Sequence, residues 1–256
     1  MTAAASAAAR VHIAGSVAAP PPYAASAAAG VWAALESVRD PELDESVTAL
    51  GFVSSCTVSD DGVAEIRLRL PTYFCAPNFA FLMVADAYDA ASAVDGIRRA
   101  EVVLEDHFAS TEINGGVAAR SGFMQTFDGE AVDELTDLRR DFLRKAVWAG
   151  TDRVCRPLVA AGSAAEDLVA LTLGDTPSGP DLTRLRQRRV ELGLPAGDAD
   201  PLLLDPATGA PVALEALPLH LRRARLTRVS LDANSGVCRG MLAHRYGTVD
   251  ERGEDE

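Results

Sequence analysis

The sequence LPTYFCAPN at residues 70–78 marks the point where a predicted strand gives way to a predicted helix. Residues 63–70 before it alternate polar and apolar side chains, a pattern typical of a strand with one buried face. Pro71 cannot continue a strand ladder, whereas Pro77 suits the first turn of a helix, where the missing N–H has no partner anyway. We therefore expect Cys75 at a helix N-terminus.

Cys75 is the candidate functional residue of this stretch. Unpaired N–H groups and the positive end of the helix dipole favour an anion there, so we expect this thiol to ionise more readily than that of a free cysteine. A thiolate is the form that binds metal or attacks an electrophile. The alternative is a buried structural thiol, because free cysteine is among the most buried residue types.

The composition is that of a soluble chain able to bury a sizeable core, with 256 residues of which 48% are hydrophobic and 24% charged. A formal net charge of -13 argues against nucleic acid or an anionic membrane as the main partner. No apolar run is long enough to span a bilayer. The four cysteines form no C-x-x-C pair and we recognise no secretory leader, so we expect a reducing, cytoplasmic setting.

The chain divides into four predicted parts. Residues 1–30 are rich in Ala, Ser and Pro and are expected to be disordered. Residues 31–108 are expected to form a small α/β domain, and residues 109–248 a mainly helical extension. Residues 249–256 are read as an acidic, solvated tail.

The order of predicted elements in residues 31–108 indicates an α+β fold with a mixed three-stranded sheet. We expect, in order, a helix at 31–38, strands at 52–58 and 63–70 joined by the hairpin turn SDDG, a helix at 77–94 and a strand at 97–104. The hairpin makes the first two strands antiparallel. The helix between the second and third strands makes that pair parallel, by a right-handed crossover.

This topology brings three loops, at residues 40–50, 71–76 and 105–108, to one edge of the sheet. The candidate metal ligands in these loops are Cys75, His107, Glu42, Asp40 and Asp106. A thiolate, an imidazole and a carboxylate together suit iron or zinc. The alternative for the histidine is a ring that hydrogen-bonds to local backbone.

In the extension we expect a loop around residues 114–116, and then helices at 131–159, 163–173, 180–193 and 218–246. The second of these carries the capping-box pattern SAAE, and the third places four arginines, Arg184, Arg186, Arg188 and Arg189, around a solvated face. The last helix is expected to be interrupted near residues 234–236. Cys56 and Cys155 are interpreted as core thiols.

The last helix also offers a second thiol. Asn234 and Cys238 are four residues apart and can share a helix face, with Arg239 adjacent. A cysteine beside an arginine would supply a second stabilised thiolate that reaches back to Cys75. The alternative is plain helix packing.

Three features together resemble one protein family: the sequence DPE at residues 40–42, the sequence LGFV at 50–53, and a strand that ends in a cysteine followed by a helix. They resemble the MIP18 family, also called the domain-of-unknown-function-59 family, of iron–sulfur cluster assembly factors, over residues 31–105. The resemblance implies a small α/β domain whose one reactive cysteine delivers iron–sulfur clusters or iron to apoproteins. It makes Cys75 that cysteine, and Asp40 and Glu42 the acidic motif.

The sequence departs from the usual family pattern, Leu-Thr-x-Pro-Gly-Cys-Pro. Pro71 occupies the threonine position, Thr72 follows one residue late as a candidate neighbour of the cysteine, and the proline is displaced to Pro77. The part after residue 105 is similar to that of long actinobacterial members found beside genes for multicomponent di-iron monooxygenases. That likeness implies a non-haem iron oxygenase as the client.

Our leading hypothesis is a non-enzymatic assembly factor that holds iron or an iron–sulfur fragment transiently through Cys75 and passes it to an apo-metalloenzyme. One alternative is a metal-free folding chaperone for a multicomponent oxygenase. Another is an enzyme with Cys75 as nucleophile and His107 as base, although no oxyanion or substrate motif is recognisable. The sequence leaves the oligomeric state open, and a homodimer would bring two copies of Cys75 together to bridge a cluster.

Overall fold

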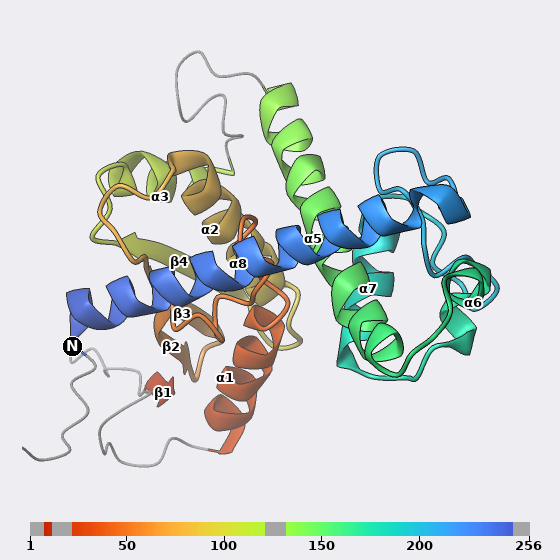
Figure 1. Cartoon of the computed structure of the whole chain (residues 1–256). Coiled ribbons are helices and arrows are strands. Elements are labelled where there is room, and N and C mark those ends of the chain that lie inside the picture. Colours follow the sequence, from red (N-terminus) through yellow and green to blue (C-terminus); the bar gives the residue numbers. More distant parts are fainter. Residues whose placement is uncertain (1–7, 12–21, 121–131, 248–256) are drawn as a thin grey trace, which may run out of the picture. The chain divides into compact units, whose positions relative to one another are not determined.

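The structure is a computed structural model that describes residues 8–11, 22–120 and 132–247 (Figure 1). No helix within these ranges combines the length and the apolar character that a membrane span requires. The predicted acidic tail at residues 249–256 lies outside the described residues.

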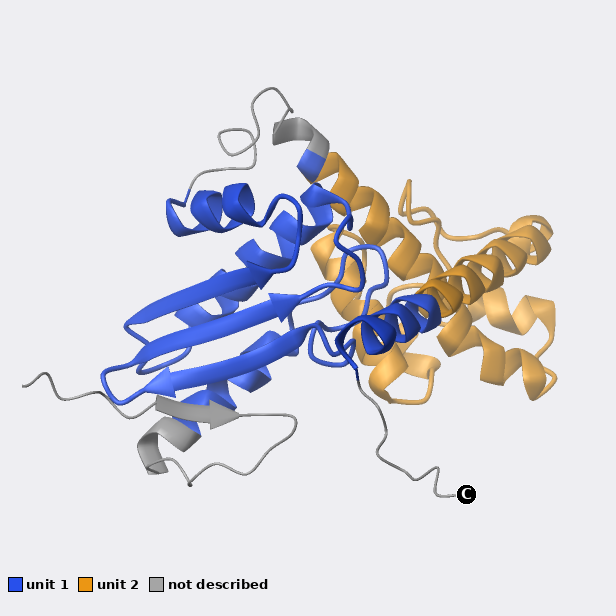
Figure 2. Cartoon of the chain, turned by 90° about the vertical axis from the view of Figure 1, so that its left-hand side faces the viewer, with its two compact units in different colours: residues 1–135, 235–256 blue, residues 136–234 orange. Residues whose placement is uncertain are grey.

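The chain forms two compact units, the first of residues 1–135 and 235–256 and the second of residues 136–234 (Figure 2). This division differs from the boundary that we expected at residue 108. The segment just after that position and the end of the C-terminal helix both bury side chains in the core of the first unit, among them Ile113, Val117 and Leu242. Both ends of the predicted extension therefore belong to the first unit.

The first unit is built on a four-stranded sheet in the order β1-β2-β3-β4. The strands are β1 (Ala8–Val11), β2 (Val53–Ser59), β3 (Val63–Arg69) and β4 (Arg99–Glu105). β1 pairs antiparallel with β2, and β2 antiparallel with β3, whereas β3 and β4 are parallel. The α+β class and the mixed sheet are confirmed. β1 was not predicted, because its sequence AARV has too little β-forming character to stand out.

The alternating pattern of β3 sets which side of the sheet is covered. Ile66 and Leu68 are buried, while Glu65 and Arg67 point to the other face and are exposed. Ile66 pairs with Val102 of β4, which is also buried. One face of the sheet therefore belongs to the core, as the sequence predicted.

Three helices lie wholly within the first unit: α1 (Pro22–Leu35), α2 (Pro77–Ser92) and α3 (Ser110–Ala118). α1 contacts β2 and α2, while α3 contacts α2 and β4. α2 buries a wide arc that includes Phe81, Met83 and Val84, which confirms the expectation of a largely covered helix. As the crossover between β3 and β4, α2 also leaves its preceding loop at the edge where both strands end.

Two segments of the first unit correct the predictions. α1 begins at Pro22, within the stretch expected to be disordered, because proline is accepted in a first helical turn and the alanines behind it pack closely; Ala28 is fully buried. The loop expected around residues 114–116 is helix α3, in which the buried Ile113 and Val117 lie four residues apart. The two glycines of that segment obscured the helical spacing.

The second unit is mainly helical. Its elements are α5 (Val132–Ala160, shared with the first unit), α6 (Ala165–Ala170), η1 (Leu173–Asp175), α7 (Pro180–Glu191), η2 (Leu214–Ala216) and α8 (Leu217–Tyr246, also shared). A core that includes Val147, Cys155, Leu173 and Leu185 holds them together. The core positions predicted for Cys155 and, in the first unit, for Cys56 are confirmed.

Three predictions for this half of the chain are wrong. Arg188 and Arg189 of α7 are buried rather than solvated, and Arg189 donates hydrogen bonds to the carbonyl groups of Pro201, at 2.8 Å, and Leu202. The capping box lies at η1, between Thr172 and Asp175, and not at residues 163–166. α8 continues without interruption through residues 234–236.

Candidate functional site

Cys75 lies in the loop between β3 and α2, at the edge where β3 and β4 end. α2 starts at Pro77, and the residue before it, Ala76, has the non-helical backbone angles φ -57° and ψ 127°. The predicted position of the cysteine at a helix N-terminus is therefore confirmed. Its side chain is half-buried, packs against the core of the first unit and forms no disulfide.

Thr72 contacts the thiol directly. Its Oγ1 atom lies 3.3 Å from Sγ of Cys75 and accepts a hydrogen bond of 3.3 Å from the backbone N–H of Phe74. Either the hydroxyl or the thiol can donate in this contact. The structure thus brings Thr72 to the cysteine from its displaced position in the sequence.

His107 lies close to Cys75 but its ring nitrogens are both engaged. Nε2 lies 2.7 Å from the carbonyl oxygen of Cys75, and Nδ1 accepts a 3.2 Å hydrogen bond from the N–H of Ala109. The ring therefore carries its proton on Nε2 and donates it to the loop backbone. His107 has 3% of its surface exposed, and its two ring contacts match the alternative that the sequence left open, a ring that hydrogen-bonds to local backbone. Its role as a metal ligand remains a prediction.

Arg239, near the end of α8, fastens the acidic loop at residues 40–50. Its guanidinium donates to the carbonyl oxygen of Ala49 at 2.7 Å, forms an ion pair with Glu45 and contacts the hydroxyl of Ser235 at 3.3 Å. The positive charge of this arginine is thus paired with the negative charge of Glu45. The structure gives it the role of a tether for the loop.

Arg245, one and a half turns further along α8, fastens the other two loops. It donates to the carbonyl oxygen of Leu70 at 3.1 Å and to that of Asp106 at 2.5 Å. The two acceptors lie in the loop before Cys75 and in the loop after β4. The predicted convergence of three loops at this edge is confirmed, and the end of α8 joins them.

Cys238 lies on this same part of α8 and is half-buried. Burial raises the pKa of its thiol to about 11, and the nearby charges of Asp40, Cys75 and Glu42 add to the rise. Cys238 and Cys75 both pack against the core of the first unit. A direct approach of the second thiol to Cys75 remains a prediction.

Asp40 and Glu42 contribute differently to the site. Asp40 is buried, and its Oδ1 atom accepts hydrogen bonds of 2.9 Å from the N–H groups of both Glu42 and Leu43. Burial raises the pKa of Asp40 to about 6. Asp40 thus caps its own turn, while Glu42 is half-buried and its carboxylate acts on Cys238.

The remaining predicted residues lie at the margins. Asp106 is exposed and has a φ of 49°; burial raises the pKa of Tyr246, and this aspartate adds to the rise. It therefore sits beside the end of α8. Asn234 is exposed and is the last residue of the second unit. Their predicted roles as ligand and supporting residue remain predictions.

Three exposed aromatic rings flank the thiol, and we call Tyr73, Phe74 and Phe108 the aromatic rim. Their exposed fractions are 47%, 77% and 47%. The ring centroids of Phe74 lie 5.0 Å from Tyr73 and 5.9 Å from Phe108, and the N–H of Phe108 donates to the carbonyl oxygen of Tyr73 at 3.1 Å. A soluble protein rarely gathers large apolar side chains on its surface without a binding role.

The described residues contain no group of three or more His, Cys, Asp or Glu side chains arranged to hold a metal ion. What the first unit does offer is two half-buried thiols, Cys75 and Cys238, that pack against the same core. Such a pair can supply part of a coordination sphere but does not complete one.

Sequence reasoning missed Arg245 and the aromatic rim. The rim had a signal, since Tyr73 and Phe74 replace the Pro-Gly pair of the family pattern and exchange two small residues for two large rings. Arg245 had none, because only the folded chain brings the C-terminal helix to loops that lie more than 130 residues earlier.

Comparison with known proteins agrees with the position of the site. A family model described as "Iron-sulfur cluster assembly protein" matches residues 28–104. An uncharacterized protein of Methanocaldococcus jannaschii is 28% identical over 81 residues, which make up 32% of this chain and 83% of that protein. No solved structure matches the chain. The matched segment includes Asp40, Glu42 and Cys75, so the part of the chain that carries the candidate site is similar to the iron–sulfur cluster assembly protein family over residues 28–104.

Proposed function

We propose that this protein carries iron or an iron–sulfur fragment on Cys75 and Cys238 and passes it to an apo-metalloenzyme. The family of residues 28–104 supports a role in iron–sulfur cluster assembly. The observation that carries the proposal is the half-exposed thiol of Cys75 at the start of α2, with a second half-buried thiol, Cys238 of α8, packed against the same core. All four cysteines are free, which suits work in a reducing cytoplasm.

The number of ligands supports transient carriage. A permanent iron–sulfur cluster is typically held by four protein thiolates, and this edge of the chain supplies two. Positions left open on the iron can be taken by the client or by a second copy of the chain. Because Cys238 must lose its proton to bind, retention of the cargo should also strengthen as the pH rises.

The aromatic rim is the surface that we assign to the client. Tyr73 and Phe74 are in the same loop as Cys75, and Phe108 is hydrogen-bonded to that loop. Buried aromatic side chains dominate the energy of many interfaces, and docking here brings a client's own ligands to the thiol. The likeness of the extension to long family members supports a di-iron monooxygenase as that client.

The test is the iron and acid-labile sulfide content after anaerobic purification and reconstitution. Wild type is compared with Cys75→Ser, and Cys155→Ser serves as the matched control because its thiol is buried in the second unit. We expect the cargo in wild type and in the control, and its loss in Cys75→Ser. Iron with sulfide indicates cluster carriage, and iron alone indicates donation of iron. Equal loading of wild type and Cys75→Ser contradicts the proposal.

A metal-free chaperone is the second candidate, and the aromatic rim favours it, because exposed rings would serve a docking surface whether or not cargo is carried. This function predicts that Cys75→Ser still supports assembly of an active client, while Phe74→Ala does not. The two functions are separated by whether wild type retains iron at all.

A further inference from the structure

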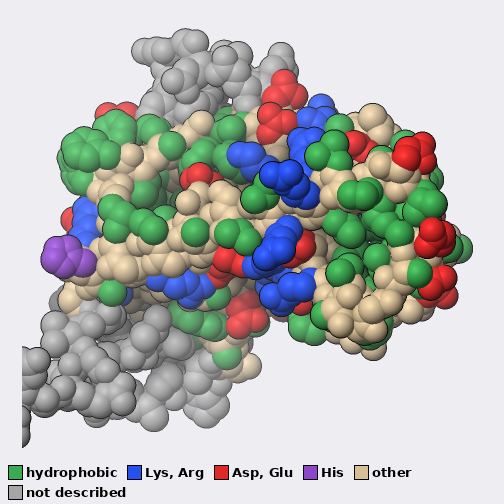
Figure 3. Space-filling view, viewed as in Figure 1, with side chains coloured by type: hydrophobic (Ala, Val, Ile, Leu, Met, Phe, Trp, Pro, Cys, Tyr) green, Lys and Arg blue, Asp and Glu red, His purple; other side chains and the backbone are tan. Residues whose placement is uncertain are grey.

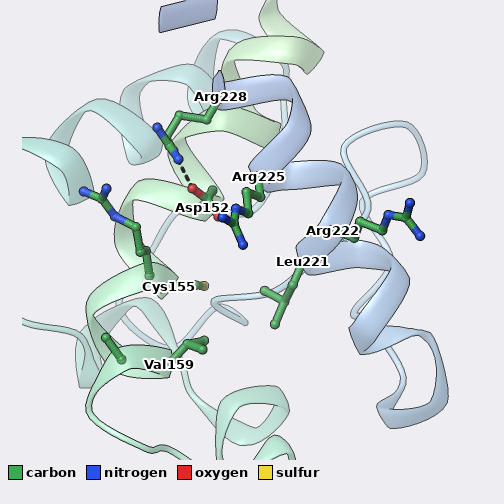
Figure 4. A pocket seen from close by; sticks show the side chains of 9 residues that line it. Asp152, Cys155, Val159, Leu221, Arg222, Arg225 and Arg228 are labelled. Carbon is green, nitrogen blue, oxygen red and sulfur yellow. Dashed lines mark hydrogen bonds and ion pairs between the residues drawn. The ribbon is translucent and has the colours of Figure 1, made fainter. Parts of the chain in front are cut away.

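The second unit contains a cavity of about 530 Å³ between α5 and α8 (Figure 4). α5 lines it with Asp152, Cys155 and Arg156, and α8 with Leu221 and Arg225, among others. Pockets for small molecules typically enclose about 300–1,000 Å³. The cavity is therefore of a size that suits a small organic ligand.

The charge of the cavity is opposite to that of the chain. Its lining includes four arginines, Arg156, Arg222, Arg225 and Arg228, against a single carboxylate, Asp152, whereas the whole chain has a formal net charge of -13. Figure 3 shows basic side chains gathered in the middle of this face, where Figure 1 places α5 and α8. A concave surface of one sign concentrates counter-ions of the other.

The single carboxylate of the lining already forms an ion pair. Asp152 accepts a 2.5 Å hydrogen bond from Nε of Arg228, which also donates to Asp232 at 2.7 Å. Arg153 pairs with Asp232 at 3.0 Å. These ion pairs join α5 to α8 and hold the walls of the cavity in place.

The other three guanidinium groups of the lining form no such ion pairs among the described residues. Arg156, Arg222 and Arg225 are exposed, and none of them forms a hydrogen bond or ion pair with a carboxylate among the described residues. In Figure 4, Arg225 extends from α8 toward Asp152 and the middle of the cavity, while Arg222 points outward at the rim. Arg225 is thus the best-placed group for an incoming anion.

The rest of the lining is apolar. Figure 4 shows Cys155 and Leu221 facing each other across the cavity, with Val159 one turn along α5 from the cysteine. Burial raises the pKa of Cys155 to about 12, so the thiol is a neutral, weakly polar wall. An exposed fraction of 46% leaves Val159 open to contact with a ligand.

We propose that this cavity binds a small organic anion, with a carboxylate or phosphate group held by Arg225 and an apolar body against Leu221 and Val159. Guanidinium groups bind both kinds of anion through paired, charge-assisted hydrogen bonds. The site is separate from the cargo thiols, and it would make the second unit a sensor or carrier of a metabolite-sized anion.

The test uses the full chain and four probes: phenyl phosphate, benzoate, inorganic phosphate and the uncharged analogue phenol. Binding is measured by calorimetry and by protein NMR on wild type, Arg225→Ala and Arg140→Ala. The last variant removes an exposed arginine from α5 outside the cavity and so changes the net charge equally. Leu221→Ala tests the apolar part of the site.

We expect phenyl phosphate or benzoate to bind more tightly than phenol, and binding to weaken roughly tenfold or more in Arg225→Ala but not in Arg140→Ala. Whichever of the two anions binds more tightly identifies the head group. Leu221→Ala should weaken the aromatic anions while leaving inorganic phosphate unchanged. Binding of phenol equal to that of both anions, or equal binding to wild type and Arg225→Ala, overturns the proposal.

Discussion

Cys75 in the first unit and Cys155 in the second are the same residue type in opposite surroundings. Cys75 sits in a loop before α2, half-exposed and beside the hydroxyl of Thr72. Cys155 lies inside α5, has 1% of its surface exposed, and burial raises its pKa to about 12. Cys155 has Asp152 and Arg189 nearby, yet burial is the largest influence on its pKa, so the difference comes from where the backbone places the sulfur. Proximity of charged residues alone does not make a thiol reactive; access and solvation do.

The largest effect that this comparison predicts is on alkylation. With iodoacetamide at pH 7.5 we expect Cys75 to be modified at least about a hundredfold faster than Cys155, because the buried thiol is both inaccessible and protonated. Mass spectrometry of tryptic peptides over time measures each rate. Cys56, whose pKa burial raises to about 11, should be as slow as Cys155. Comparable rates of alkylation at Cys75 and Cys155 in the folded chain would contradict the predicted difference in reactivity between the two thiols.

The next effect concerns the second thiol of the cargo site. Cys238→Ser should leave some iron bound to Cys75 but speed its release to a chelator by roughly tenfold or more, since one of two thiolate ligands is lost. Release is followed by the absorbance of the chelate after anaerobic loading. Cys155→Ser is again the control, with the wild-type release rate expected. An unchanged rate in Cys238→Ser would reduce the site to a single thiol.

The two units should also respond to pH in opposite directions, beginning with the first. Asp40 has a pKa of about 6 in the folded chain against 3.8 when unperturbed, because burial disfavours its charge. Folding therefore binds its proton, and the first unit should lose about 3 kcal/mol of stability as the pH rises from about 4 to above 6. Asp40→Asn keeps the oxygen acceptor without the charge and should remove this loss.

In the second unit, His220 is buried, and its ring centroid lies 4.4 Å from that of Trp148 with the two planes tilted by 49°. Burial lowers the pKa of His220 from 6.5 to about 4. The unfolded chain then binds the proton more readily, so stability is present above pH 6.5 and lost as the pH falls toward 4. Replacing His220 with Phe keeps an aromatic ring against Trp148 and should remove this dependence.

The two tryptophans of the chain allow both slopes to be measured, since Trp32 lies in the first unit and Trp148 in the second. Urea unfolding of Trp148→Phe and Trp32→Phe backgrounds, followed by fluorescence, reports each unit separately. Slopes of the same sign in both units would contradict the assignment of these two groups.

The smallest predicted effect separates two exposed apolar side chains. Phe74→Ala in the aromatic rim should slow transfer of bound iron–sulfur cargo to an apo-ferredoxin acceptor several-fold while leaving loading unchanged. Leu219→Ala in the second unit is the control, because its exposed fraction of 73% is close to the 77% of Phe74. Neither change should alter stability by more than about 0.5 kcal/mol. Equal transfer rates in the two variants would exclude the rim from transfer.

The sequence by itself determined three of the four strands of the sheet and the placement of Cys75. The alternation in β3, the turn before it and the proline at the start of α2 are local signals. Such signals can be interpreted without knowing how the rest of the chain folds. The same signals predicted that three loops meet at one edge, because connection rules are nearly independent of side chains. Its errors arose where local preference was weak, as in β1 and α3.

Only the tertiary structure decided which side chains surround the cysteine loop and what each of them contacts. It turned His107 toward the backbone of Cys75, brought Arg245 of α8 to the cysteine loop, and buried Arg189, which had been placed on a solvated face. These outcomes depend on contacts between residues far apart in the sequence, and on which hydrogen-bond partners a buried polar group finds. The spacing of residues in the sequence does not reveal these partners. The sequence could therefore predict which residues gather near Cys75 but not what each of them contacts.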